Sequence, residues 1–177
     1  LARFRNEVQA AARLEHDHVV RVYEVGEIDG QSYYTMQYVE GESLIDLLRE
    51  GPLEPEDAVQ YVRQAAEGLA AAHAIGILHR DLKPHNVMID RVTGRAMLAD
   101  FGLAKLDEGE SNLTVANTGA GSPPWMAPEQ IQDFKSVTAA ADVYGLGATL
   151  YHALTGRPPF TVDSLGAMRS NSANSCR

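Results

Sequence analysis

The spacing of hydrophobic positions along the chain predicts short strands and several helices, which together favour an α+β fold. Residues 21–27 and 33–39 are rich in β-branched and aromatic residues and are separated by five residues that include a glycine, so we expect a β-hairpin. Short apolar runs at 77–79, 87–89 and 96–99 predict three buried strands.

Helical spacing recurs at four places. Apolar residues repeat at this spacing over residues 4–14, and Ser43 is a suitable N-cap for the short apolar helix that follows it. A long helix is expected from 54 to about 74, because a proline lies near its first turn and acidic residues lie at its positive end. Residues 137–154 are apolar on nearly every face and predict a core helix. The stretch 103–124 lacks periodicity and is typical of a functional or mobile loop.

Charge and composition narrow the possible functions. The net charge of −9 argues against a general nucleic-acid binder, which needs a basic face to neutralise phosphates. No stretch approaches the roughly 18 apolar residues of a membrane span. The single cysteine, Cys176, excludes an internal disulfide and a multi-cysteine zinc site, and it fits a reducing, cytoplasmic setting.

The two ends of the chain predict that it is cut from a longer protein. Its first residue is Leu1, inside the first expected helix, and no basic-then-apolar signal region precedes that helix. The last residues, 169–177, are dominated by serine and asparagine and have no periodicity, so we expect a disordered or non-native tail.

The strongest chemical motif is HRDLKPHN at residues 79–86. Asp81 and Asn86 stand five residues apart on a loop after a short strand, where both can point at one small volume. The carboxylate can accept a proton from an attacking hydroxyl, and the amide oxygen can bind a hard metal ion. The alternative is a polar turn in which both side chains make local backbone hydrogen bonds.

Three weaker motifs follow. Asp100 ends an apolar strand and precedes Phe101 and a glycine, which suits a Mg²⁺ ligand but also an ordinary turn. Residues 127–129 read Ala-Pro-Glu, which alone could be a turn before a helix. Asp142 lies within the expected core helix, where a carboxylate is costly unless it is hydrogen-bonded, although an Asp in a first turn can also serve the helix dipole.

Together, in this order and spacing, the four motifs resemble a eukaryotic-like protein kinase over about residues 4–160. The Leu-Lys-Pro after Asp81 resembles the serine/threonine class, and the style of the sequence looks bacterial. The resemblance implies an α+β, protein-kinase-like fold with a mostly helical large lobe and a partial small lobe of helix C plus a hairpin. It implies three parts: 1–38 as the partial small lobe, 39–166 as the partial large lobe, and 167–177 as the tail.

The resemblance also implies a signalling transferase that uses ATP and Mg²⁺ to phosphorylate Ser and Thr hydroxyls of proteins. Asp81 would be the catalytic base and Lys83 would neutralise charge on the transferred phosphoryl group. Asn86 and Asp100 would hold the Mg²⁺ ions.

The nucleotide-binding residues rest on the same resemblance. Glu7 would pair with a strand lysine upstream of the sequence. Met36 would be the gatekeeper beside the adenine, Gln37 and Val39 would offer backbone hydrogen bonds to it, and Met88 would form an apolar floor under the ring.

Regulation by phosphorylation is implied as well. A phosphate on the loop after Asp100 would pair with Arg80 and Lys105. Thr118 aligns with the usual primary site and Thr114 is second, although both could be plain exposed hydroxyls. Ser122 matches a hydroxyl that bonds near the catalytic residues.

The sequence departs from the family at both ends. A Gly-rich phosphate loop and the strand lysine are expected upstream of it, and the family's last helices beyond it, together with the arginine that would pair with Glu129. Phe101, His79 and Ala11 match a stacked apolar spine, and Gly145 stands where a small residue such as Ser is usual. We therefore expect this 177-residue piece to expose Leu and Val from the core helix, to be poorly soluble and to be inactive alone.

Three alternatives remain. The main one is a pseudokinase, a module that binds a nucleotide or a partner without phosphotransfer; the upstream lysine would decide between the two. A small-molecule kinase shares the catalytic Asp and Asn, but the motifs at 100–102 and 127–129 argue against it. A generic α+β binding protein is remote.

Overall fold

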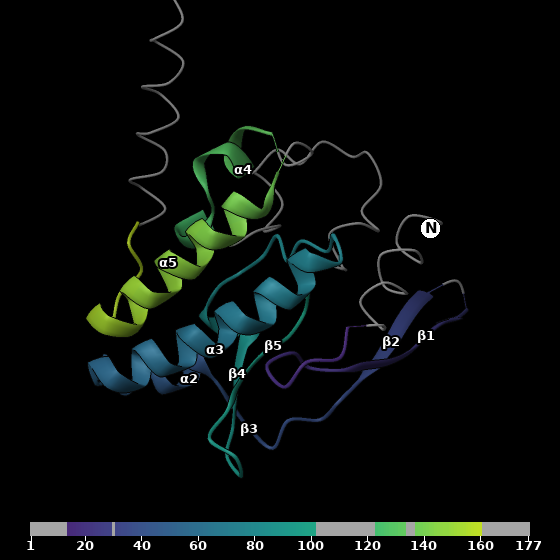
Figure 1. The fold of residues 1–177 in the computed structure, drawn as a ribbon, viewed down its shortest axis with the longest axis horizontal. Coiled ribbons are helices and arrows are strands. Elements are labelled where there is room, and N and C mark those ends of the chain that lie inside the picture. The colour runs from purple at the N-terminus through teal and green to yellow at the C-terminus, as the bar shows by residue number, and fades with distance from the viewer. Residues whose placement is uncertain (1–13, 30, 102–122, 134–136, 161–177) are drawn as a thin grey trace, which may run out of the picture.

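The computed structural model describes residues 14–29, 31–101, 123–133 and 137–160 (Figure 1). The first sheet has two antiparallel strands, β1 (Val22–Ile28) and β2 (Gln31–Met36), whose register pairs Ile28 with Gln31. The chain turns at Asp29, which has a positive φ of 52°. The predicted hairpin is therefore confirmed, with slightly different strand ends.

A second, three-stranded antiparallel sheet has the order β3–β4–β5, with strands Gly41–Ser43, Val87–Asp90 and Ala96–Leu98. Two of the three predicted buried strands are thus confirmed. The sequence did not indicate β3, whose backbone approaches β4 closely: a Cβ at Gly41 would lie 1.8 Å from the carbonyl oxygen of Ile89.

The strand predicted at 77–79 is wrong, and the hydrogen bonds of this segment explain why. The Ile77 N–H donates to the Ala72 carbonyl at 3.0 Å, which prolongs the end of a helix. The His79 N–H donates to the Asp142 carboxylate at 2.9 Å. A helix end and a side chain therefore satisfy these donors, in place of a neighbouring strand.

Two of the predicted helices lie in the first half of the described chain. The short helix α2 (Leu44–Leu47) has the expected N-cap, Ser43, whose backbone N–H donates to Asp46 Oδ2 at 3.3 Å. The long helix α3 (Pro55–Ala74) begins and ends within a residue of the prediction. It packs closely on the segment before β1, since a Cβ at Gly68 would lie 2.4 Å from the His18 carbonyl oxygen.

The helix predicted at 137–154 exists as α5 (Ala139–Thr155), capped by the Thr138 hydroxyl, but it is not buried on nearly every face as expected. The buried side chains are small or polar, namely Ala141, Asp142, Gly145, Ala148, Thr149, His152 and Ala153. Val143 is 60% exposed and Leu154 is 39% exposed. The expectation of a helix buried on nearly every face is therefore wrong, whereas the expected exposure of Val and Leu is found.

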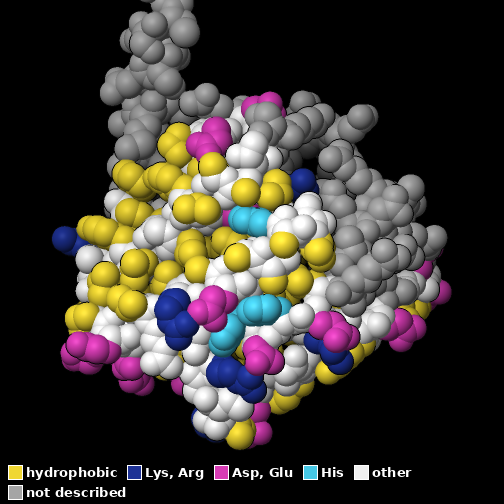
Figure 2. All heavy atoms as spheres, viewed as in Figure 1, with side chains coloured by type: hydrophobic (Ala, Val, Ile, Leu, Met, Phe, Trp, Pro, Cys, Tyr) yellow, Lys and Arg dark blue, Asp and Glu magenta, His cyan; other side chains and the backbone are white. Residues whose placement is uncertain are grey.

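The physical reason is close packing against the loop at 79–86. A Cβ at Gly145 would lie 3.0 Å from the Leu82 carbonyl oxygen, so a large side chain does not fit at this position of α5. Figure 1 shows α5 lying along α3. Figure 2 shows hydrophobic side chains gathered over this part of the surface. The exposed large hydrophobic residues of the two helices are Val59, Val143, Tyr151 and Leu154.

The main core lies between α3 and the second sheet. It includes the fully buried side chains of Leu44, Val87 and Leu98 and extends to Phe101. Three short helices complete the described chain: η1 (Pro84–Asn86), η3 (Pro123–Trp125) and α4 (Pro128–Gln132). Within the described residues, we find no helix with the length and apolar character needed to cross a membrane.

Three predicted segments lie largely or wholly outside the described residues. The tail expected at 169–177 is wholly outside them. Of the helix expected at 4–14, only Leu14 is described, and it is buried. Of the loop expected at 103–124, only the last two residues are described, and they begin η3.

Candidate active site

The loop at 79–86 is anchored by a fully buried histidine. His79 Nε2 lies 3.0 Å from the Ala99 carbonyl oxygen, and its Nδ1 lies 3.3 Å from the Asp81 backbone N–H. Burial lowers the pKa of His79 despite the nearby Asp142 and Asp81 carboxylates. The neutral ring therefore donates from Nε2 and accepts at Nδ1. Its centroid lies 4.7 Å from that of Phe101, so the two rings pack together.

A buried carboxylate holds the same loop from the side of α5. Asp142 is only 1% exposed and accepts three hydrogen bonds, as a carboxylate in this position requires. Its donors are the His79 N–H at 2.9 Å, the Arg80 N–H at 2.7 Å and His73 Nε2 at 2.8 Å. Arg80 has a positive φ of 61°, an unusual conformation for a residue with a side chain. Asp142 thus fixes the backbone immediately before Asp81.

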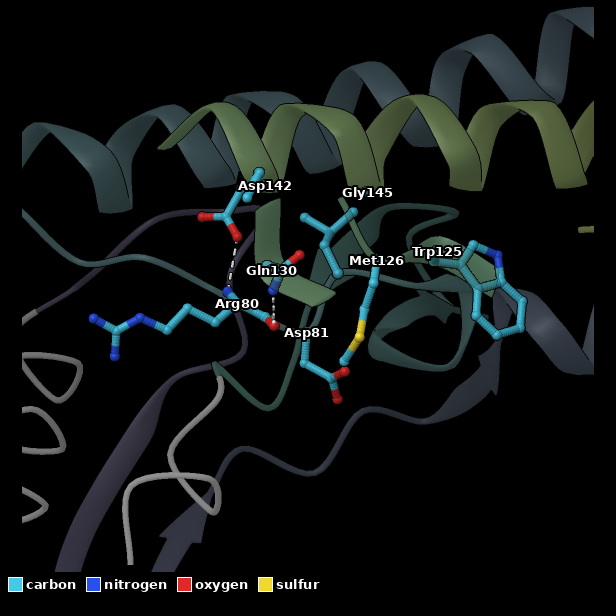
Figure 3. A pocket seen from close by; sticks show the side chains of 9 residues that line it. Arg80, Asp81, Trp125, Met126, Gln130, Asp142 and Gly145 are labelled. Carbon is cyan, nitrogen blue, oxygen red and sulfur yellow. Dashed lines mark hydrogen bonds between the residues drawn. The ribbon is translucent and has the colours of Figure 1, made fainter. Parts of the chain in front are cut away.

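The structure brings three of the predicted catalytic residues together. Lys83 Nζ lies 2.8 Å from Asp81 Oδ2. Asn86 Nδ2 donates to the Asp81 carbonyl oxygen at 2.8 Å and lies 3.5 Å from Asp81 Oδ2. The turn of η1 produces this arrangement by folding Asn86 back toward Asp81. Figure 3 shows the Asp81 side chain pointing away from α5, while the Arg80 guanidinium extends in another direction.

Asp100 is joined to this loop through its backbone, but its carboxylate bonds elsewhere. The preceding residue, Ala99, donates its N–H to the Asn86 carbonyl oxygen at 2.9 Å. Asp100 itself has a positive φ of 53°, and its Oδ1 accepts a 2.7 Å hydrogen bond from the Tyr34 hydroxyl of β2. Burial and the Asp100 carboxylate raise the pKa of Tyr34, which keeps that hydroxyl protonated as the donor.

A small hollow that is partly open to solvent lies beside Asp100. It is lined by the predicted gatekeeper Met36, which is 45% exposed, and by Tyr34 and Phe101. The remaining side chains that line it are aliphatic. They are Leu14, Val19, Val20 and Val22.

The other predicted adenine contacts lie near one another. Val39 and Met88 belong to one apolar cluster, which also contains Val20, Met97 and Ala99. The Gln37 N–H donates to the Arg21 carbonyl at 2.8 Å, so its own carbonyl oxygen is the backbone atom it can offer to a ligand. The remaining predicted site residues lie outside the described residues. They are Glu7, Lys105, Thr114, Thr118 and Ser122.

A second small pocket is lined in part by Asp81 and lies between the loop at 79–86, α4 and α5 (Figure 3). It is lined in part by Gln130, whose Nε2 donates to the Arg80 carbonyl oxygen at 2.9 Å. Gln130 was not predicted from the sequence, because this contact joins residues 50 positions apart. Tyr34 was not predicted either, although its position indicates it: Tyr34 stands two residues before Met36 on one strand and so shares its face.

The oxygen donors of Asn86 and Asp100 are of the type that Mg²⁺ prefers. Asn86 Nδ2 donates a hydrogen bond to the Asp81 carbonyl oxygen, so the amide oxygen of Asn86 is the atom that can bind a cation. Among the described residues, no group of three or more His, Cys, Asp or Glu side chains could hold a metal ion. Mg²⁺ commonly takes only one or two protein ligands together with substrate phosphates, so the chemistry of these two oxygen donors suits Mg²⁺ bound with ATP.

Comparison with known proteins agrees with this geometry. The chain matches the protein kinase domain family over residues 2–175. It is 42% identical over 170 residues to the serine/threonine-protein kinase PknH of Mycobacterium bovis, covering 96% of this chain and 28% of PknH. It is 42% identical over 167 residues to PknE of Mycobacterium tuberculosis, covering 94% of this chain and 29% of PknE. The chain therefore spans less than a third of the length of these curated relatives.

Solved structures show the same fold. The PknI kinase domain of Mycobacterium tuberculosis matches with a TM-score of 0.74 and 33% identity, over 90% of this chain and 58% of that one. Rad53 in complex with AMP-PNP matches with a TM-score of 0.74 and 28% identity, over 91% of this chain and 40% of that one.

These matches confirm the α+β, protein-kinase-like fold and the serine/threonine class of the relatives. The named curated relatives come from mycobacteria, in agreement with the expected bacterial character. With the family match covering nearly its whole length, the chain belongs to the protein kinase domain family.

Proposed function

We propose that this chain supplies the catalytic centre of a protein serine/threonine kinase, which transfers the γ-phosphate of ATP to Ser and Thr hydroxyls of proteins. The observation that carries the proposal is the Asp81 constellation. A carboxylate lies 2.8 Å from a lysine ammonium, on a loop that Asn86 closes through the Asp81 carbonyl. The family match and the named relatives support the same chemistry.

Asp81 is the proposed catalytic base and orients the substrate hydroxyl. Its carboxylate can accept the proton of the hydroxyl as the oxygen attacks phosphorus. Lys83 already lies at hydrogen-bond distance from Asp81, so its positive charge is available beside the transferred phosphoryl group. Most of the rate enhancement then comes from the fixed positions of these groups.

Asn86 and Asp100 are the proposed Mg²⁺ ligands. Mg²⁺ bound with ATP supplies positive charge at the phosphates, where negative charge develops during transfer. The Asn86 amide nitrogen is held by the Asp81 carbonyl and orients the amide oxygen. The Asp100 carboxylate keeps one oxygen, Oδ2, outside its hydrogen bond to Tyr34.

The adenine site is proposed at the junction of the two sheets. Met36 would lie beside the ring and Met88 beneath it, while Gln37 would offer its carbonyl and Val39 its backbone. The shared apolar cluster of Val39 and Met88 supports this placement. Glu7, outside the described residues, would complete the site by pairing with an upstream lysine.

The lobe boundary and the regulation follow as further parts of the proposal. A boundary at 38/39 is supported by the separate sheet of β1 and β2 and by the start of β3 at Gly41. A phosphate on Thr118 or Thr114 would pair with Arg80 and Lys105, and Ser122 would bond near Asp81. A cytoplasmic setting is part of the same proposal and rests on cysteine usage.

The test is phosphotransfer from labelled ATP to a mixture of Ser- and Thr-containing peptides. It uses a version of the protein that carries the complete kinase domain, because the resemblance to protein kinases implies that a Gly-rich loop and a lysine also form part of the site. Asp81→Asn should lower kcat by about 10²–10⁴-fold while leaving the affinity for ATP nearly unchanged. Asp90→Asn is the matched control, because the Asp90 carboxylate accepts from the backbone N–H groups of Val92 and Thr93 in an exposed turn.

Two outcomes would count against the proposal. If Asp81→Asn retains full activity, Asp81 is not the base. If the wild-type protein binds ATP with Mg²⁺ but transfers no phosphate, the pseudokinase alternative is correct.

A further inference from the structure

We infer that Gln130 is a positioning residue, which sets the peptide plane that carries Asp81 and couples it to the segment at 123–133. This inference rests on the proposed function of Asp81. It concerns a contact between two parts of the chain that no motif connects: Gln130 Nε2 to the Arg80 carbonyl oxygen, at 2.9 Å.

The Arg80 carbonyl oxygen and the Asp81 N–H belong to one peptide unit. Gln130 Nε2 donates to the oxygen of this unit, and the Asp81 N–H of the same unit donates to His79 Nδ1 at 3.3 Å. The preceding peptide unit is held by the Arg80 N–H bond to Asp142 at 2.7 Å. Both polar groups of the unit that leads into Asp81 therefore have a side-chain partner, and Gln130 is the partner of the carbonyl.

The conformation of Arg80 gives this contact its importance. With a φ of 61°, Arg80 lies in the left-handed region, which costs free energy for a residue with a Cβ. Such a conformation persists only when its surroundings hold it. Asp142 and Gln130 hold the two polar backbone groups of Arg80 from different elements, α5 and α4.

Gln130 itself is well placed for the task. Its side chain is buried, at 6% exposure. Its Oε1 accepts from the Ala127 N–H at 3.2 Å, which fixes the orientation of the amide and directs Nε2 to Arg80. Because Ala127 is the first residue of the Ala-Pro-Glu motif, any shift of this motif moves the amide that holds the Asp81 peptide. Figure 3 shows the two ends of this link, with Gln130 directly above Arg80 and Asp81 beside it.

The experiment compares Gln130→Met with Gln64→Met in the protein with its complete kinase domain. Gln64 is the control, because it is also a buried glutamine that is hydrogen-bonded to the backbone, but it lies between α3 and β5, where its Oε1 accepts from the Ala96 N–H at 2.7 Å. Gln130→Met should lower kcat at least tenfold and change the KM for ATP less than twofold. Gln64→Met should lower the thermal midpoint by a similar amount and leave kcat per folded molecule within twofold of wild type.

A second variant and a second readout separate positioning from mere stability. Gln130→Glu places an acceptor against the Arg80 carbonyl at high pH, but a protonated Glu can donate to it. Its kcat relative to wild type should therefore rise as the pH is lowered from 8 to 6. Amide hydrogen exchange should also be faster at residues 79–86 in Gln130→Met and unchanged there in Gln64→Met, which is measurable even if activity is weak.

The outcomes distinguish this inference from the proposed function. If Asp81→Asn abolishes phosphotransfer but Gln130→Met and Gln64→Met behave alike in kcat and in exchange, the positioning role is wrong and the proposed function stands. If Asp81→Asn has no effect, the proposed function fails, and only the exchange result then decides whether Gln130 orders the loop.

Discussion

The loop that carries Asp81 and the turn that carries Asp100 are held in different ways, although the proposed chemistry needs both carboxylates. Side chains from α4 and α5 hold the backbone next to Asp81, which is further bonded by His79 and Asn86. Among the residues that the structure describes, the Asp100 carboxylate accepts one hydrogen bond, from Tyr34, which belongs to the separate two-stranded sheet.

The difference teaches that only one half of the site is preorganised by the main core. The Asp81 half has buried partners on the same body of packed helices, so its position changes only if that packing changes. The Asp100 half depends on where the β1–β2 hairpin lies, because the hydroxyl that holds its carboxylate comes from β2. Three predictions test this contrast, from the largest expected effect to the smallest.

Replacing Asp142 should break the preorganised half. Asp142→Ala leaves three donors without their acceptor, those of His79, Arg80 and His73, and all three are buried or partly buried. We expect the free energy of unfolding to fall by about 3 kcal/mol or more. Chemical denaturation followed by circular dichroism measures this. The free energy of unfolding of Asp142→Asn, which keeps one acceptor oxygen, should lie between those of Asp142→Ala and the wild type. Equal stability of Asp142→Ala and wild type would contradict the prediction.

Lowering the pH should reduce the free energy of unfolding by an intermediate amount, through buried histidines in and near the Asp81 half of the site. Burial lowers the pKa of His79, and burial is also the main cause of the lowered pKa of His85 and His152. In the unfolded chain a histidine has a pKa of about 6.5, so the unfolded state takes up more protons as the pH falls through that value. The stability contributed by the neutral rings is therefore fully present above about pH 6.5 and is lost below it.

Urea denaturation at pH 7.5, 6.5 and 5.5 measures this dependence, in a range above the ordinary pKa of about 4 of carboxylic acids. The midpoint should fall toward pH 5.5. His152→Leu removes one titrating ring and should make the dependence shallower. A midpoint that rises toward pH 5.5 would mean that the sign is wrong.

The smallest effect is expected in the Asp100 half. Tyr34→Phe removes one hydrogen bond to a carboxylate on an exposed residue, so the free energy of unfolding should fall by only about 1 kcal/mol. A double-mutant cycle with Asp100→Asn measures the coupling, and Tyr33→Phe on the neighbouring position of β2 is the control. Zero coupling would show that the Tyr34 hydroxyl does not hold Asp100.

Much of the fold followed from local patterns. The hairpin, the long helix and the strands at 87–89 and 96–99 were predictable because their periodicity and caps are local properties of the chain. The strand β3 and the absence of a strand at 77–79 were not, since both depend on where distant backbone groups find partners. The same is true of α5, whose buried face is decided by the close approach of Leu82 and not by the hydrophobicity of its own residues.

By itself, the sequence determined the chemistry available to this protein: the residue types and order of Asp81, Lys83, Asn86 and Asp100, and with them the resemblance to protein kinases. Only the tertiary structure decided how these groups are oriented. Asp142 and Gln130 reach the loop from 62 and 50 residues away, and Tyr34 reaches Asp100 across 66. Side-chain hydrogen bonds of this range depend on packing between whole elements, and no local spacing encodes that packing.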